Sequence, residues 1–152
     1  MGLNDHISIT PAKLANLLEN GNISEFNNER KQIKQQIVFD SIDLSNKDLS
    51  GVELRSLVML HSNLSNTNLE NSSLTDVQIS GNLSNINLRN ADLLNADLRD
   101  SDLTNADLTL TILNGSVFNC KSLRTANLTD NAKQFHIVES INGSLKEVSS
   151  CR

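Results

Sequence analysis

The sequence predicts an all-β solenoid, a stack of about five square coils, with an α-helical cap at its N-terminal end. Two observations predict the coils. A large apolar residue recurs at every fifth position from Phe39 to Leu128, and a small or short apolar residue stands two positions before most of these. The first 36 residues lack this period and carry helix signals instead. We therefore divide the chain into an N-terminal helical cap (1–36), the coils (37–130) and a C-terminal cap or tail (131–152).

The N-terminal cap is predicted to contain two helices. A solenoid exposes its apolar interior at both ends, so a cap is needed there. Thr10-Pro11 is typical of a helix start, and Gly21 is typical of a helix end. One apolar face lies between them and consists of Leu14, Leu17 and Leu18. A second helix is expected from about Ser24 to Gln35. Its solvated side is expected to carry Glu29, Lys31, Lys34 and Gln35.

A period of five residues fits neither an α-helix nor a long strand, but it fits a chain that turns a corner every five residues. Within each unit, the large residue and the small residue two before it point the same way, as alternate residues of an extended segment do. Four corners close a square, so about twenty residues make one coil, and neighbouring coils can pair at roughly 4.8 Å. The second inward position has to be small because a second leucine would overfill the narrow interior.

Sorting the large residues into four faces tests this geometry. All of the centres that are not leucine fall on the first face, which holds Phe39, Met59, Ile79, Leu98 and Phe118. The columns continue past one missing residue after Ile79, so we interpret Ser80-Gly81 as a tightened corner. A ladder of corner amides supports the register and consists of Asn46, Asn66, Asn85 and Asn105. Its role is interpreted as structural.

The cleanest stretch reads ADLLN-ADLRD-SDLTN-ADLTL, from Ala91 to Leu110. It resembles the A(D/N)Lxx consensus of the pentapeptide-repeat family, and the resemblance covers residues 37–130. The resemblance implies a right-handed quadrilateral parallel β-helix with an interior of stacked Leu or Phe. It also suggests a bacterial source, because cyanobacteria are especially rich in such proteins.

The tail after Leu128 is predicted to contain one strand, over residues 134–138 (QFHIV), and a short helix that starts at Ser144. The helix is expected because Ser144 and Glu147 have the spacing of a capping box. Two interpretations of the tail stay open. It is either a cap on the solenoid or a dimer contact, since some family members pair through their C-terminal ends.

No catalytic, cofactor-binding or metal-binding residues are predicted. The three histidines, His6, His61 and His136, lie in different regions of the chain, which is unlike a zinc site. The repeated aspartates point outward in four directions and do not converge: Asp92, Asp97, Asp102 and Asp107. The nearest approach to a cation site is one corner with Asp97, Asp100 and Asp102.

Charge and composition restrict the partner classes. Residues 40–130 carry twelve acidic and six basic residues, a net charge of −6, which disfavours direct nucleic-acid binding. No apolar run is long enough for membrane insertion, and Met1–Thr10 lacks the pattern of a signal peptide. Two cysteines, Cys120 and Cys151, are too few for a disulfide framework, so a reducing cytoplasm is the expected compartment.

Four outward apolar residues form the candidate interaction surface: Leu94, Leu110, Ile112 and Val117. Either the tail covers them, through Phe135, Ile137 and Val138, or they meet a partner or a second copy. The predicted function is a non-enzymatic scaffold for protein–protein interaction with an unknown protein partner, as a monomer or a C-terminal-end dimer. The family resemblance implies an alternative, a DNA-mimic inhibitor of DNA gyrase or topoisomerase that confers quinolone resistance.

Overall fold

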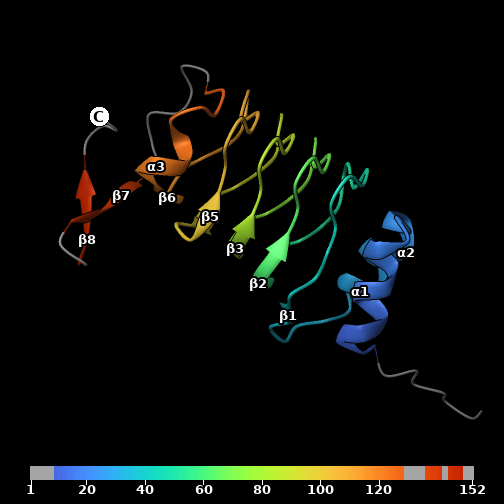
Figure 1. Ribbon diagram of the computed structural model, residues 1–152. Coiled ribbons are helices and arrows are strands. Elements are labelled where there is room, and N and C mark those ends of the chain that lie inside the picture. The colour runs from blue at the N-terminus through green and yellow to red at the C-terminus, as the bar shows by residue number, and fades with distance from the viewer. Residues whose placement is uncertain (1–8, 129–135, 142–143, 149–152) are drawn as a thin grey trace, which may run out of the picture.

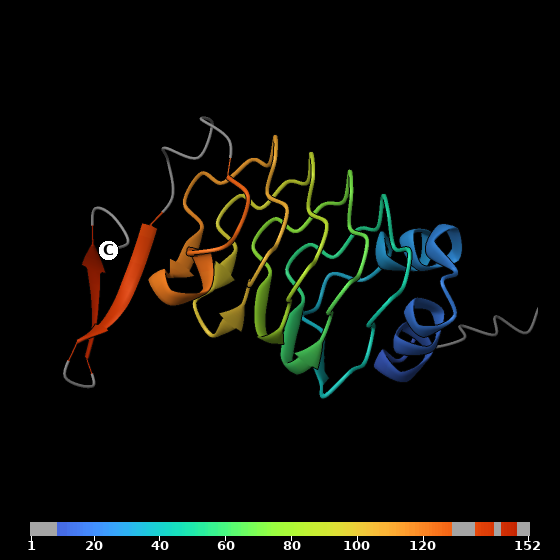
Figure 2. The same ribbon diagram turned by 45° about the horizontal axis from the view of Figure 1, so that its top comes forward.

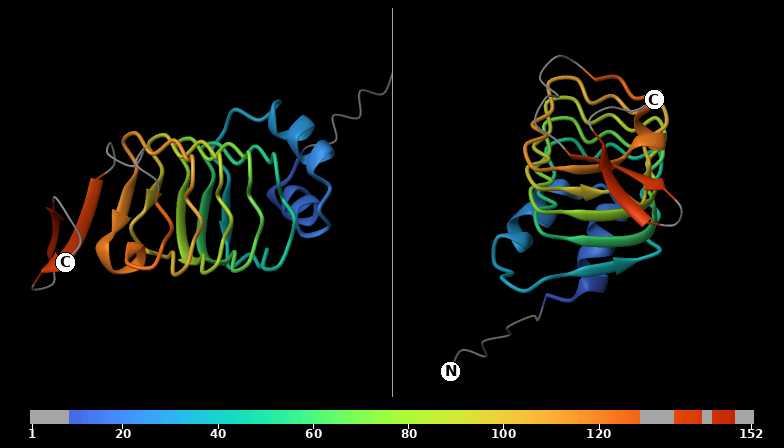
Figure 3. Two further views of the ribbon diagram at one scale, coloured as in Figure 1. Left: turned by 90° about the horizontal axis from the view of Figure 1, so that it is seen from above. Right: turned by 90° about the vertical axis from the view of Figure 1, so that its left-hand side faces the viewer.

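The computed structural model describes residues 9–128, 136–141 and 144–148. The coils stack into a short rod with two helices at the N-terminal end and a strand pair at the other end (Figure 1). Seen along the rod, each coil is a square (Figure 3). The predicted parallel β-solenoid with an N-terminal helical cap is confirmed, and its first column of strands makes four complete turns from Phe39 to Phe118. A fifth coil begins after Phe118 and is described as far as Leu128.

Helix α1 (Pro11–Glu19) begins and ends as the sequence predicts. The Oγ1 of Thr10 accepts a hydrogen bond from the Lys13 N–H at 3.1 Å, and Pro11 occupies the first turn. Gly21 has a φ of +69°, in the left-handed region that ends many helices. The three leucines of the predicted apolar face are buried: Leu14, Leu17 and Leu18.

Helix α2 (Ile23–Arg30) is shorter than predicted and ends at Arg30 rather than near Gln35. The chain tightens there, because Gln32 N–H bonds the Glu29 carbonyl and Ile33 N–H bonds the Arg30 carbonyl. The Arg30 guanidinium holds this turn by donating to the Ile33 carbonyl and to the carbonyl of Arg55 on the first coil. A bond to a residue 25 positions away could not be read from helix signals.

The first face is a parallel sheet in which each strand pairs with the strand one coil further on. Its members are β1 (Val38–Asp40), β2 (Val58–Asn63), β3 (Gln78–Asn82), β4 (Asp97–Leu98) and β6 (Val117–Asn119). The short strand β5 (Ser101–Asp102) pairs with β3 past the next corner. Isolated parallel bridges such as Asp48↔Asn68 and Asp92↔Ile112 connect the coils on the other faces. The solenoid is therefore held by inter-coil backbone bonds on all four sides (Figure 2).

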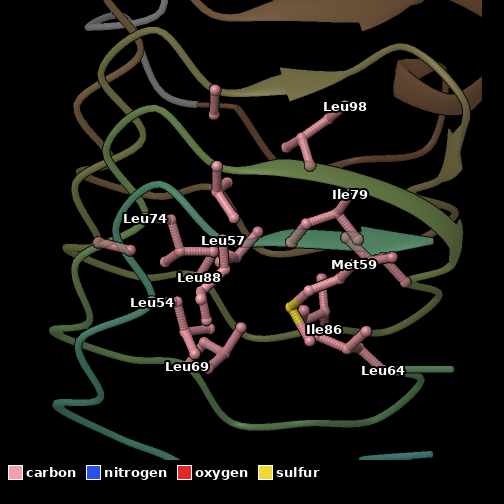
Figure 4. Packing of buried hydrophobic residues seen from close by; sticks show 14 of the residues in the cluster. Leu54, Leu57, Met59, Leu64, Leu69, Leu74, Ile79, Ile86, Leu88 and Leu98 are labelled. Carbon is pink, nitrogen blue, oxygen red and sulfur yellow. The ribbon is translucent and has the colours of Figure 1, made fainter. Parts of the chain in front are cut away.

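The core is the stack of inward centres, in the columns predicted. Met59, Ile79 and Leu98 follow one another along the first face, and Leu54 and Leu74 do so on the fourth (Figure 4). These five side chains are at most 1% exposed. The small inward position has an additional role where it is a hydroxyl. Four such hydroxyls donate to a carbonyl of the preceding coil at 2.6–3.1 Å: Thr67, Ser101, Thr111 and Ser116.

The missing residue after Ile79 is confirmed as a tightened corner. Met59 pairs with Ile79, but the next pair is Ser62↔Gly81, so β2 has one more residue at this corner than β3. Gly81 has a φ of +134°, and a Cβ there would overlap the backbone of Ser62. Only glycine therefore fits this corner without rearrangement.

The C-terminal elements differ in part from the predictions. A short helix, α3 (Cys120–Leu123), interrupts the last coil, although Leu123 stays buried as predicted. Strand β7 (His136–Ile141) extends the first face beside β6, which confirms a strand here; Phe135 lies outside the described residues. Residues Ser144–Val148 form β8, antiparallel to β7, so the predicted helix is wrong. Two short runs that contain β-branched residues are separated in the sequence by Asn142-Gly143, and this hairpin signal outweighs the capping box.

Cys120 is buried and disulfide-bonded, which the cysteine count did not predict. The only other cysteine in the sequence, Cys151, lies outside the described residues. Among the described residues, no helix is long and apolar enough to cross a membrane.

Candidate interaction surface

Three of the four predicted surface residues stand together on or beside the fourth face. Ile112 is paired with Asp92 on the coil before it, and Leu94 lies two residues beyond Asp92 on that same earlier coil. Leu110 lies two residues before Ile112, at the preceding corner. We call Leu94, Leu110 and Ile112 the apolar patch; they are 37%, 52% and 52% exposed. The patch therefore spans two adjacent coils near the C-terminal end.

Val117 belongs to a different environment. It lies on β6 in the first face, between Asp97 of β4 and His136 of β7, and is half-buried. Strand β7 extends this first face, whereas the apolar patch is on the fourth. The three residues of the patch are exposed in the described structure. Phe135 lies outside the described residues, so the interpretation that the tail covers the patch stays a prediction.

Ile112 is the one apolar member of its outward column among the bridged residues of the described coils. From the N-terminal side the column runs Glu53, Ser73, Asp92 and Ile112. An outward isoleucine cannot reach the interior, which is filled by the inward residues of the same strand segment, and about half of Ile112 stays exposed. Its presence is not explained by the stability of the solenoid.

Leu110 is the stronger anomaly because its backbone is also strained. Its φ is +60°, and every other residue besides glycine with a positive φ in the described chain is Asn, Asp, Ser or His. The corresponding corners of the earlier coils hold Gly51, Asn71 and Asn90. A leucine in the left-handed region costs about 1–2 kcal/mol, a cost that asparagine at this corner largely avoids.

The outward aspartates serve the corners of the solenoid. Asp43 and Asp48 accept the backbone N–H groups of Ser45 and Ser50 at 3.0 and 3.1 Å, and these bonds hold the pKa of both carboxyls below the usual range. In the same column as Asp43, three coils further on, the Thr104 hydroxyl and N–H lower the pKa of Asp102 in the same way. These oxygens are occupied by donors two residues away, so they stabilise turns.

The corner with Asp97, Asp100 and Asp102 is not assembled as a cation site. Hydrogen bonds from the Arg99 side chain, with Nε 2.8 Å from Oδ1, lower the pKa of Asp97 and neutralise its charge locally. Asp102 is engaged by Thr104. In the described part of the chain, no three His, Cys, Asp or Glu side chains come together as a metal site.

A pH experiment tests the structural role of the aspartates. Carboxyls with a lowered pKa contribute stability that is present above the ordinary aspartate pKa of about 3.9 and is lost as the pH falls through their folded-state values. We expect the melting temperature to fall as the pH drops from about 5 to about 2.5. A D43N/D48N/D102N variant should lose less, because asparagine keeps the corner bond, as Asn63 and Asn82 do to Ser65 and Ser84. An equal loss in both proteins would contradict this role.

Comparison with known proteins identifies the repeat. A family model described as pentapeptide repeats matches eight copies, over residues 36–71 and 82–119. The interval between the two matched segments ends at Gly81, the tightened corner. Among curated proteins, no sequence matches the chain.

Two solved structures from cyanobacteria are similar to this chain. The first is HetL from Nostoc sp. strain PCC 7120, a pentapeptide repeat protein involved in heterocyst differentiation regulation. It is 31% identical over 72% of this chain and 46% of its own, with a TM-score of 0.59. The second is the pentapeptide repeat protein Rfr23 from Cyanothece 51142, 32% identical over 60% of each chain, with a TM-score of 0.52. This chain therefore spans about half to three fifths of the length of these two relatives.

A third structure is more distant. QnrB1, a plasmid-mediated fluoroquinolone resistance protein, is 20% identical over 61% of this chain and 50% of its own, with a TM-score of 0.34. A likeness at this level carries no argument about function.

Proposed function

This chain belongs to the pentapeptide-repeat family, and from that premise we propose that it is a non-enzymatic scaffold that binds a protein partner through the apolar patch. The observation that carries the proposal is Leu110, an apolar side chain half exposed to solvent on a strained corner. The other coils hold residues that tolerate this conformation better at the same corner, Gly51, Asn71 and Asn90. A strained residue that leaves about half of its apolar side chain exposed is typical of a binding surface.

The apolar patch is small, and its size fits a contact with a small apolar surface on a protein partner. Its three side chains lie on two coils, which are separated by roughly 4.8 Å, and polar groups such as Asn90 and Asp92 border it. An apolar centre with a polar rim is the usual organisation of protein interfaces. The net charge of −6 over the coils makes a nucleic-acid partner unfavourable.

A double variant separates binding from folding. Leu110→Asn and Ile112→Ser introduce residue types that the same columns hold in other coils, at Asn90 and Ser73. We expect the L110N/I112S variant to melt at the same or a higher temperature, with Leu110→Asn alone stabilising by about 1 kcal/mol. We expect its affinity for the partner to fall at least about tenfold, because two apolar contacts are removed.

The measurement uses wild type, the double variant and a matched control, Val38→Thr, in parallel. Val38 is 50% exposed at the opposite end of the rod, so the control removes exposed apolar surface outside the patch. Proteins captured by wild type and V38T but not by L110N/I112S are purified and titrated by calorimetry. Light scattering over a concentration series identifies a second copy as the partner, if the dimer is lost only in L110N/I112S. Equal affinity in all three proteins would overturn the proposal.

The gyrase-inhibitor alternative stays a prediction from the family resemblance. The cytoplasmic compartment stays a prediction from the cysteine count. The four complete turns give a rod of only roughly 20 Å. A supercoiling assay with the purified protein decides the alternative, which inhibition at micromolar concentrations would support.

A further inference from the structure

A basic pocket lies where the N-terminal cap joins the first coil. The helical cap stands at the opposite end of the rod from the last coils, which carry the apolar patch (the ribbons of Figures 2 and 3 show the two ends). Its volume is about 470 Å³, and its walls come from the end of α2, the following residues to Gln36, and residues 53–56 of the first coil. Four cationic side chains and one carboxylate line it: Arg30, Lys31, Lys34, Arg55 and Glu53. The pocket is thus surrounded by a net charge of +3 in a protein whose total charge is −5.

Most of this positive charge is not neutralised internally. The only carboxylate in the wall, Glu53, pairs with Arg55, whose Nε and Nη2 lie 3.0 and 2.8 Å from Glu53 Oε2. Within the described chain, Arg30, Lys31 and Lys34 pair with no carboxylate. Three cations therefore share one concave surface without an acidic partner.

Arg30 is held rigidly in this wall. Its two Nη atoms donate to the carbonyls of Ile33 and Arg55, which anchor the side chain but do not neutralise it. Its Nε is buried without a hydrogen-bond partner among the described residues. Arg30 and Arg55 line the same wall, and burial together with the neighbouring Arg55 lowers the pKa of Arg30. Positive charges held close together repel one another, and an anion bound between them would relieve this repulsion.

A cavity of similar volume elsewhere in the molecule provides a comparison. It has about 440 Å³ and lies near the C-terminal end, where it is lined by Arg99 and Lys121 together with Asp100 and Asp102. Its charges balance, and Arg99 is engaged by Asp97. The surplus of positive charge is therefore a property of the N-terminal pocket and not of cavities in this fold generally.

We infer that the N-terminal pocket binds a multiply charged oxyanion, through Lys34 and Arg55 as mobile donors and Arg30 as a fixed positive charge. Arg55 and Lys34 are exposed enough to turn toward a ligand, and Gln35, Gln36 and Ser56 add neutral hydrogen-bonding groups to the wall. A phosphate group and a cluster of carboxylates share the chemistry that such a site recognises. This inference does not depend on the apolar patch.

The test is a calorimetric titration with inorganic phosphate and, separately, with citrate, each against sodium chloride at equal ionic strength. We expect saturable binding of at least one of the two anions by wild type. The K34Q/R55Q variant leaves the anchoring side chain of Arg30 intact and should bind at least about tenfold more weakly. The matched control, K121Q/R124Q, makes the same change of charge at exposed positions of the last coil and should bind like wild type.

Thermal unfolding of all three proteins checks that each is folded. Stronger binding of phosphate would indicate a phosphate group as the natural ligand, and stronger binding of citrate would indicate carboxylates. The inference is overturned if K34Q/R55Q binds as tightly as wild type. It is equally overturned if both double variants weaken binding alike, or if only ionic strength changes the signal, since the positive charge would then be an ordinary solvated surface.

Discussion

Replacing Leu103 with lysine is expected to abolish the folded state. Leu103 is fully buried in the second-face column, next to Leu83 of the coil before it. All four walls around it are backbone, so a lysine side chain has no route to water. Burying an unpaired ammonium costs several kcal/mol, which is comparable with the roughly 5–15 kcal/mol that stabilises a domain.

Circular dichroism and a thermal melt measure this effect. The control is Thr104→Lys, which adds the same charge one residue later on the exposed side of the strand segment. We expect T104K to melt cooperatively within a few degrees of wild type and L103K to show no cooperative transition. A normal melt for L103K would contradict the inward assignment of the whole column.

The second large effect is expected for Gly81→Ala at the tightened corner. The added methyl would overlap the carbonyl oxygen, nitrogen and carbon of Ser62, all of them backbone atoms in a sheet. Neither partner can move without breaking the pairing of β2 and β3. Adding the cost of the φ of +134°, we expect a loss of about 3 kcal/mol or more in the free energy of unfolding.

Gly51→Ala is the matched control for this experiment. Gly51 also has a positive φ, +73°, but no atom lies within 4 Å of the position of its Cβ. Its substitution therefore reports backbone strain alone and should cost about 1 kcal/mol. Urea unfolding of both variants separates the cost of the steric overlap from the cost of the backbone strain. Equal losses would show that the corner accommodates a methyl and that the tightened geometry is not specific to glycine.

The columns of the solenoid could be predicted from the sequence because the inward positions are fixed by period alone. Every coil repeats the same five-residue period, so the period alone places Phe39, Met59 and Ile79 on one face, without any long-range information. The missing residue after Ile79 was detectable for the same reason. The left-handed corners at Asn46, Asn66 and Asn85 also followed from residue type.

Features that depend on contacts outside the repeat could not be predicted in this way. The early end of α2 depends on the bond from Arg30 to the Arg55 carbonyl, and the basic pocket combines residues from both of these segments. The sequence therefore predicts only that Lys31 and Lys34 lie on the solvated side of the second helix, and it does not predict a pocket. The apolar patch was found from the sequence, but the strain at Leu110 required its φ value. The local capping pattern at Ser144 was overridden by pairing with β7.

The tightened corner at Gly81 preserves the four columns, and this has a consequence for how such a protein can change length by duplication. Adding four pentapeptides between the basic pocket and the apolar patch would move the two surfaces apart by roughly 5 Å and leave them facing the same directions. Adding one pentapeptide would instead rotate one surface against the other by about a quarter turn. The angle between the two surfaces is therefore set by the number of units between them modulo four, and their spacing by the number of coils.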